Sequence, residues 1–181
     1  MVFEKPHRLQ PFELIDHKGG KFDRERFRDH WTFLFFGYTH CPDFCPSTLA
    51  AMKRIYAALA ETPRDVPVQF VYVSVDPFRD TQSVMAEHIY FYNPEFIGVT
   101  ANDETAVRKL TEQLGVSYDY EHPETGERIT DPRALPPEFP YIVNHYGSLF
   151  LVGPDASVRA DILPPYQVAR VTEVFATLSN D

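Results

Sequence analysis

The stretch Phe33–Leu49, which reads FLFFGYTHCPDFCPSTL, decides the fold of this chain. Its aromatic run predicts a buried strand over Trp31–Tyr38, and we expect this strand to be central in a sheet. Gly37 ends the apolar run. A helix is predicted over Pro46–Ala60, because apolar side chains recur there at helical spacing.

The only two cysteines of the chain, Cys41 and Cys45, lie between these two elements. Pro42 and Pro46 disfavour helical backbone angles in the residues before them. We therefore expect both thiols in a turn that leads into the helix rather than on the face of the helix. A helix N-terminus favours a thiolate over a thiol, because unpaired N–H groups and the positive end of the helix dipole lie there.

Two thiolates held close together have two common fates. They oxidise to a disulfide, or they chelate a soft metal ion. A free cysteine is also often only a small buried hydrophobic residue. The polar, proline-rich surroundings of Cys41 and Cys45 disfavour that role. The spacing alone does not separate redox chemistry from metal binding.

Strands alternate with helices along the rest of the chain. Strands are predicted at Pro11–Asp16, Lys21–Phe22, Val68–Val75, Phe96–Thr100, Ser148–Val152 and Ser157–Ile162. Further helices are predicted at 81–92 with Asp80 as N-cap, from Asn102 to a stop at Gly115, and from Pro164 to Leu178. This order indicates one α/β domain, 1–181, with a mixed central sheet flanked by helices and an N-terminal β extension.

The segment Tyr118–Pro140 differs from the rest. It holds six carboxylates, two arginines and five prolines without a regular period. We predict a long loop insertion, which is either functional or merely solvated.

The charge of the chain limits its partners. A formal net charge of −9 argues against nucleic acid and against an anionic membrane surface, and it suits a metal ion or a cationic protein. The polar start, MVFEKPHRLQ, resembles neither a signal peptide nor a spanning helix. We expect either a cytoplasmic protein or a soluble fragment that lacks its export signal or anchor.

One of the seven histidines, His145, is a candidate third ligand. It precedes the predicted hairpin, where the end of the sheet could bring it beside the thiols. A lone histidine is more often structural. The others are discounted as solvated in polar N-terminal stretches (His7, His17, His30), as packed in a helix (His88), as a mobile surface residue (His122) or as adjacent to a thiol (His40).

Three motifs in order, GYTHCPDFCPSTL, VSVDPFRDT and NHYGSLFLVGPDASV, resemble the SCO/SenC family of copper proteins. The resemblance implies a thioredoxin-like three-layer sandwich and a role in assembling the dinuclear copper centre of cytochrome c oxidase. The copper ligands that it implies are Cys41, Cys45 and His145. Asp76 matches an acidic residue of the family and is expected to act as a fourth ligand or to support the ligands from outside. Family members commonly have aspartate where this chain has Asn144.

The resemblance also implies partners. The recipient would be the copper-bearing subunit of cytochrome c oxidase or another apo cuproprotein, and a thioredoxin-like reductant would keep the thiols reduced. The protein would be periplasmic, or membrane-anchored and facing the periplasm. Two other functions stay open: a thiol–disulfide oxidoreductase, and a redox sensor that uses the Cys41/Cys45 pair. A classical enzyme is not expected.

Overall fold

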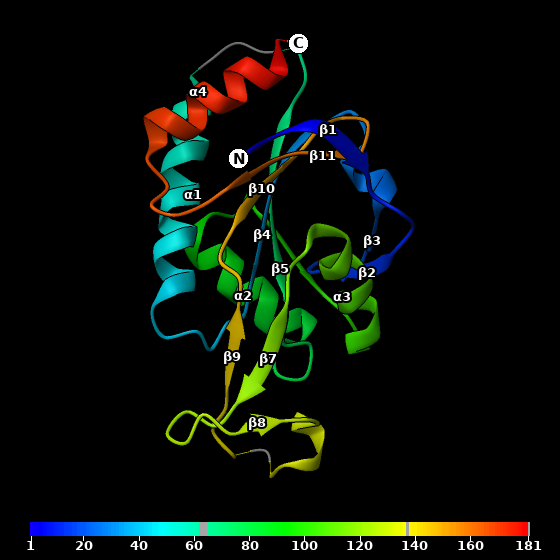
Figure 1. Ribbon diagram of the computed structural model, residues 1–181, viewed down its shortest axis with the longest axis vertical. Coiled ribbons are helices and arrows are strands. Elements are labelled where there is room, and N and C mark those ends of the chain that lie inside the picture. The colour runs from blue at the N-terminus through cyan, green and yellow to red at the C-terminus, as the bar shows by residue number, and fades with distance from the viewer. Residues whose placement is uncertain (62–64, 137, 181) are drawn as a thin grey trace.

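The computed structural model describes residues 1–61, 65–136 and 138–180. Within them, eight strands form one sheet in the order β1-β11-β10-β4-β5-β6-β2-β3 (Figure 1). The strands are β1 (Val2–Arg8), β2 (Glu13–Asp16), β3 (Lys21–Asp23), β4 (Trp31–Gly37), β5 (Val68–Ser74), β6 (Ile97–Thr100), β10 (Leu149–Val152) and β11 (Ser157–Ile162). The β4–β5 and β5–β6 pairs are parallel and the other pairs are antiparallel.

The centre of the sheet is β4, as predicted. All seven of its residues are buried, because the strand is paired on both edges and covered on both faces. Phe33 stacks on Phe70 of β5 with ring centroids 4.8 Å apart. Phe36, on the other face, packs against Phe150 of β10 at 6.1 Å. An apolar run without alternation is typical of a strand that is buried on both sides.

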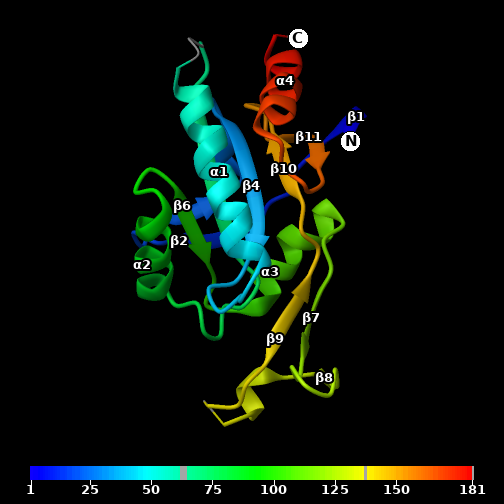
Figure 2. The ribbon, with the colours of Figure 1, turned by 90° about the vertical axis from the view of Figure 1, so that its left-hand side faces the viewer.

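Helices cover both faces of this sheet. Figure 1 shows α1 (Phe44–Ala60), α2 (Gln82–Tyr92) and α4 (Val168–Ser179) on one side and α3 (Glu104–Thr111) on the other. Figure 2 looks onto the side of α1. The predicted three-layer α/β sandwich with a mixed sheet is therefore confirmed. None of the helices in the described part of the chain is long and apolar enough to span a bilayer.

The segment predicted as an irregular insertion contains strands. A second sheet joins β7 (Tyr118–Glu121), β8 (Arg128–Ile129) and β9 (Ile142–His145) in the order β8-β7-β9, and it projects away from the end where α4 lies (Figures 1 and 2). The prediction that this segment has no regular period was wrong for β7, in which buried tyrosines alternate with partly exposed acidic residues. An alternation over only four residues is too short to be recognised within a proline-rich segment.

One further prediction needs correction, and one strand was not predicted. Thr81, not Asp80, caps α2, and its side chain accepts a hydrogen bond from the N–H of Val84. The strand β1 was not predicted, because its side chains are nearly all exposed and show no alternation. It is held instead by backbone pairing with β11.

Candidate metal centre

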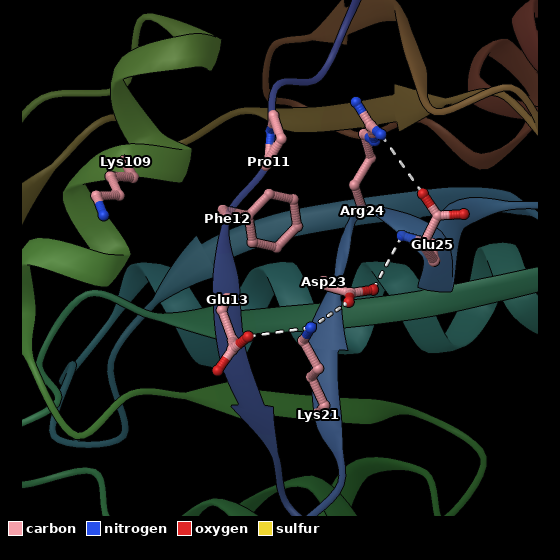
Figure 3. Close-up of a pocket in the computed structure, with 8 residues that line it drawn as sticks. All are labelled: Pro11, Phe12, Glu13, Lys21, Asp23, Arg24, Glu25 and Lys109. Atoms are coloured by element: carbon pink, nitrogen blue, oxygen red, sulfur yellow. Dashed lines mark hydrogen bonds and ion pairs between the residues drawn. The ribbon is translucent and has the colours of Figure 1, made fainter.

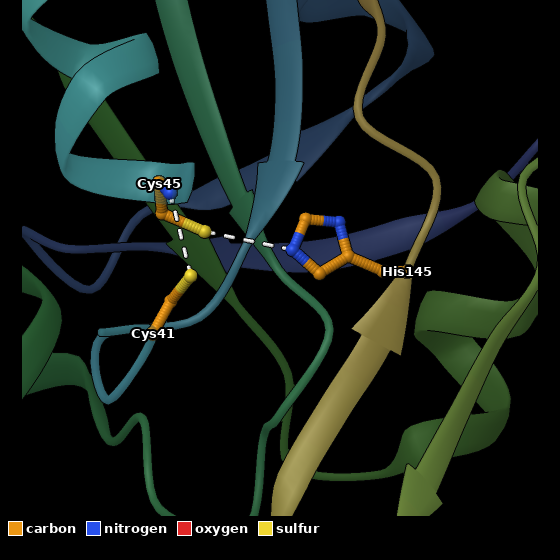
Figure 4. A group of neighbouring side chains, drawn as sticks. All are labelled: Cys41, Cys45 and His145. Atoms are coloured by element: carbon orange, nitrogen blue, oxygen red, sulfur yellow. Dashed lines mark hydrogen bonds between the residues drawn. The ribbon is translucent and has the colours of Figure 1, made fainter. Parts of the chain in front are cut away.

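Three side chains that are distant in sequence meet at one end of the main sheet. The ligand atoms of Cys41, Cys45 and His145 all lie within 4.8 Å of one another. Cys45 Sγ is 3.5 Å from His145 Nε2, and the N–H of Cys45 donates to Cys41 Sγ at 3.3 Å (Figure 4). Both cysteines are free thiols. Across the described ranges, no other cluster of three or more His, Cys, Asp or Glu side chains is as close.

Each ligand comes from a different local structure. Cys41 lies in the turn after β4, and His145 is the last residue of β9. Cys45 is the second residue of α1, so the prediction that both thiols precede the helix is wrong for Cys45. Pro46 follows within the same first turn, where a missing N–H costs no helical hydrogen bond.

The two thiols have different environments. Cys41 is half-buried, whereas Cys45 is fully buried. A hydrogen bond from the Cys45 thiol, helped by His145 and by backbone N–H groups, outweighs burial and lowers the pKa of Cys41 to about 3. The same hydrogen bond, together with burial, raises the pKa of Cys45 well above its usual value. The two shifts have opposite directions, so the thiolate form is favoured at Cys41 and the thiol form at Cys45.

We expect iodoacetamide to alkylate Cys41 before Cys45, and to do so at mildly acidic pH. A thiolate is populated above its pKa, and an ordinary cysteine with a pKa of about 8.5 is almost entirely protonated at such pH. Peptide mass spectrometry after brief exposure at several pH values measures this order. In urea both thiols should react only at alkaline pH. Equal rates in the folded chain would contradict the assignment.

Aromatic rings enclose the imidazole of His145. The ring centroids of Phe35, Tyr38 and Phe44 lie 6.2, 5.9 and 6.4 Å from it. His145 Nδ1 is 3.3 Å from the carbonyl oxygen of Tyr146. When Nδ1 carries the hydrogen, it satisfies this carbonyl and leaves the lone pair of Nε2 free to bind a metal ion.

Two glycines allow the close approach of these segments. A Cβ on Gly147 would stand 2.2 Å from Cε1 of Phe44, so the chain just after His145 packs directly on the first turn of α1. A Cβ on Gly37 would stand 2.9 Å from Cys45 Sγ and 2.6 Å from Tyr72 Oη. No larger residue fits at either position without movement of the site.

Asp76 lies outside the three-residue group. It is fully buried after β5, and its carboxylate accepts hydrogen bonds from Tyr141 Oη at 2.8 Å and from Arg79 Nε at 2.6 Å. The Arg79 guanidinium stacks on the Tyr141 ring at 3.5 Å and donates to the Tyr141 carbonyl. Tyr141 directly precedes β9, so these contacts hold the strand that carries His145.

Asp80 was missed as a site residue, because its position after a strand suggested only a helix cap. It is fully buried and accepts hydrogen bonds from the N–H of Thr39 at 3.0 Å, from Thr39 Oγ1 at 2.6 Å and from Ser74 Oγ at 2.6 Å. Thr39 is two residues before Cys41. Asp80 therefore fixes the turn that presents the first thiolate.

Asn144, the departure from the family pattern, is exposed and lies directly opposite Asp119 of β7. Asp119 itself pairs with Arg128. Like charges directly opposite each other destabilise a strand pair. An aspartate at position 144 would face Asp119, and asparagine avoids this repulsion.

The discounted histidines stay outside the group, but one environment was wrongly predicted. His17 is buried, not solvated, and its Nδ1 accepts the N–H of Gly98. His88 packs between Tyr72 and Tyr92, as expected for a packed helix residue. His40 is exposed.

A shallow pocket elsewhere is lined by residues around β2, β3 and α3 (Figure 3). Lys21 bridges Glu13 and Asp23 at 3.0 Å each, and Arg24 contacts Glu25 at 3.5 Å. The eight residues that line this pocket include no cysteine or histidine, and most of their charges neutralise one another. It offers no soft-metal site.

Comparisons with known proteins agree with this architecture. The SCO1/SenC family model matches residues 3–180. A protein of Stutzerimonas stutzeri named for copper binding is 33% identical over 181 residues, which cover 100% of this chain and 81% of that protein. The mitochondrial protein SCO2 homolog of Bos taurus is 33% identical over 144 residues, which cover 80% of this chain and 49% of that relative. The chain thus spans about half the length of this mitochondrial relative.

Among solved structures, Arabidopsis thaliana ScoI with copper bound matches with a TM-score of 0.79 at 25% identity. The match covers 94% of this chain and 97% of that one. The likeness confirms the thioredoxin-like class of α/β sandwich, and the resemblance seen in three motifs extends over nearly the whole chain.

Proposed function

The chain belongs to the SCO1/SenC family, and on that premise we propose that it binds one copper ion through Cys41, Cys45 and His145 and passes it to an apo cuproprotein. The observation that carries the proposal is the convergence of two sulfur atoms and one imidazole nitrogen within 4.8 Å. Soft thiolates and imidazole are the ligands that Cu(I) prefers, and three of them satisfy it.

The charge of the donor set fits both oxidation states of copper. Two thiolates and a neutral imidazole leave one negative charge with Cu(I) and none with Cu(II). The lowered pKa of Cys41 favours it as the first sulfur to bind, and any proton on a sulfur must leave when that sulfur binds the metal. Asp76 acts through Arg79 and Tyr141 on the placement of His145, because its carboxylate is already engaged by those residues.

Delivery requires ligands that a partner can displace. Cys41 and His145 are half-buried and can be reached from outside, whereas Cys45 is fully buried. Copper would then leave Cys45 last. Family membership points to the copper-bearing subunit of cytochrome c oxidase as the recipient, on the periplasmic side of the membrane.

A second candidate function is thiol–disulfide exchange. The contrast between an accessible thiolate at Cys41 and a buried thiol at Cys45 favours it, since this is how attacking and resolving thiols are arranged. A thioredoxin-like reductant would be its partner. The approach of His145 Nε2 to Cys45 has no use in that reaction, so copper binding ranks first.

The test is titration of the reduced protein with Cu(I) in competition with a chromophoric chelator. We expect one equivalent to bind. His145→Ala should abolish the Cu(II)–thiolate absorption and weaken Cu(I) binding by about 10–100-fold. Even the loss of a residue that only hydrogen-bonds to a metal ligand costs that much affinity. Two thiolates still hold Cu(I) in this variant.

The matched control is His40→Ala, which removes an exposed imidazole next to Cys41 that is not in the group. It should bind copper as the wild-type chain does. Absence of copper binding together with efficient reduction of a disulfide substrate would reject the copper function and support the oxidoreductase.

A further inference from the structure

Tyr72 of β5 has a phenol that nothing described above accounts for. Its side chain is fully buried, and in the part of the chain that the structure describes its Oη has no hydrogen-bond partner of good geometry. A buried hydroxyl without a partner is destabilising. Phenylalanine would fill the same space without that cost, so the hydroxyl calls for a specific explanation.

The hydroxyl of Tyr72 lies near the sulfur of Cys45, beside Gly37. The Tyr72 ring packs against Phe35 at 5.8 Å and His88 at 5.5 Å. Its Oη and the Cys45 sulfur lie 2.6 and 2.9 Å from the point where a Cβ on Gly37 would stand. The two atoms therefore both border the space that Gly37 leaves free.

A sulfur that binds a metal ion does so as a thiolate, and a thiolate would give the unpartnered hydroxyl of Tyr72 an acceptor. A thiolate is a strong acceptor, and hydrogen bonds to a charged group are about twice as strong as neutral ones. The hydroxyl of Tyr72 is a donor that already lies near this buried sulfur.

We propose that Tyr72 donates its phenolic hydrogen to Sγ of Cys45 when that sulfur binds the metal, and that this bond favours Cu(I) over Cu(II). The inference rests on the copper function proposed above. A hydrogen bond to a ligating sulfur withdraws electron density from it, so the sulfur donates less to the metal. The electron-poor Cu(II) loses more by this than Cu(I). Tyr72 is thus a positioning residue that tunes the site, not a ligand.

The test is Tyr72→Phe, which removes one oxygen atom and keeps the ring. The Cu(II)–thiolate absorption should move to longer wavelength, because the sulfur lone pairs rise in energy without the hydrogen bond. The ratio of Cu(I) to Cu(II) affinity should fall by about tenfold, within the range that outer partners contribute at metal sites. One equivalent of copper should still bind.

Tyr120→Phe is the matched control. Tyr120 is also a buried tyrosine, but its hydroxyl donates to the carbonyl of Val75 at 3.1 Å. It should leave the absorption and the affinity ratio unchanged and lower the melting temperature of the metal-free chain. Tyr72→Phe should leave that melting temperature unchanged or raise it.

Three results would overturn the inference. Unchanged absorption and affinity ratio in Tyr72→Phe, with copper bound, would overturn it alone and leave the copper function standing. A metal-free melting temperature lowered as much as in Tyr120→Phe would show that the hydroxyl already has a partner. Failure of the wild-type chain to bind copper would reject the function and the inference together.

Discussion

Replacement of Cys45 by serine is expected to abolish tight Cu(I) binding while the chain still folds. Serine offers a hard, neutral oxygen where Cu(I) needs a soft thiolate, and only one sulfur and one imidazole remain. The loss of affinity should exceed the roughly 100-fold that outer partners contribute, because a ligand itself is removed. Cys41→Ser should have the same effect on copper. Competition with a Cu(I) chelator measures both variants.

The two variants should differ in stability. Cys45 is fully buried among apolar side chains, so a hydroxyl there is expected to cost about 1–3 kcal/mol of unfolding free energy. Cys41 is half-buried in a turn, and its replacement should change stability by about 0.5 kcal/mol or less. Urea denaturation of the metal-free chains separates these effects from copper affinity. Stoichiometric Cu(I) binding by Cys45→Ser, or loss of cooperative unfolding in either variant, would contradict this account.

The central part of the fold could be predicted because its signals are local. The aromatic run of β4 and the β-branched run of β5 each identify a buried strand without reference to the rest of the chain. The strands β1 and β8 carry no such signal. They are defined by backbone pairing with β11 and β7, which side-chain patterns do not report.

The residues of the site were predictable to different degrees, because some carry a local sequence signal and others are brought together only by the fold. The cysteine pair is visible as a local motif, whereas His145 is 100 residues away from Cys45. The expected end of the sheet made it a candidate, and the family resemblance made it a ligand. Asp80 was misassigned because an aspartate after a strand suits both a helix cap and a buried anchor. Tyr72 was not noticed, since a tyrosine within a buried strand is ordinarily core. What distinguishes it is that its hydroxyl and the sulfur of Cys45 lie close to the same point beside Gly37.

Phe33→Ala is expected to be the most destabilising single substitution that leaves the copper ligands untouched. Phe33 is fully buried, stacks on Phe70 at 4.8 Å and contacts Phe175 of α4 at 5.8 Å. Truncation of a buried phenylalanine costs about 3–5 kcal/mol, from lost transfer energy and the cavity left behind. That is a large part of the roughly 5–15 kcal/mol that keeps a typical domain folded. Urea denaturation of the metal-free chain measures it.

The matched control is Phe91→Ala, because the side chain of Phe91 is 81% exposed. This variant should stay within about 0.5 kcal/mol of the wild-type chain. Addition of Cu(I) should restore part of the stability of Phe33→Ala, since a ligand that binds only the folded state stabilises it. The same addition should have no such effect in Cys45→Ser. A loss below about 1 kcal/mol in Phe33→Ala would mean that β4 is not the packed centre of the core. The site would be affected as well, because this strand places Gly37 against the sulfur of Cys45.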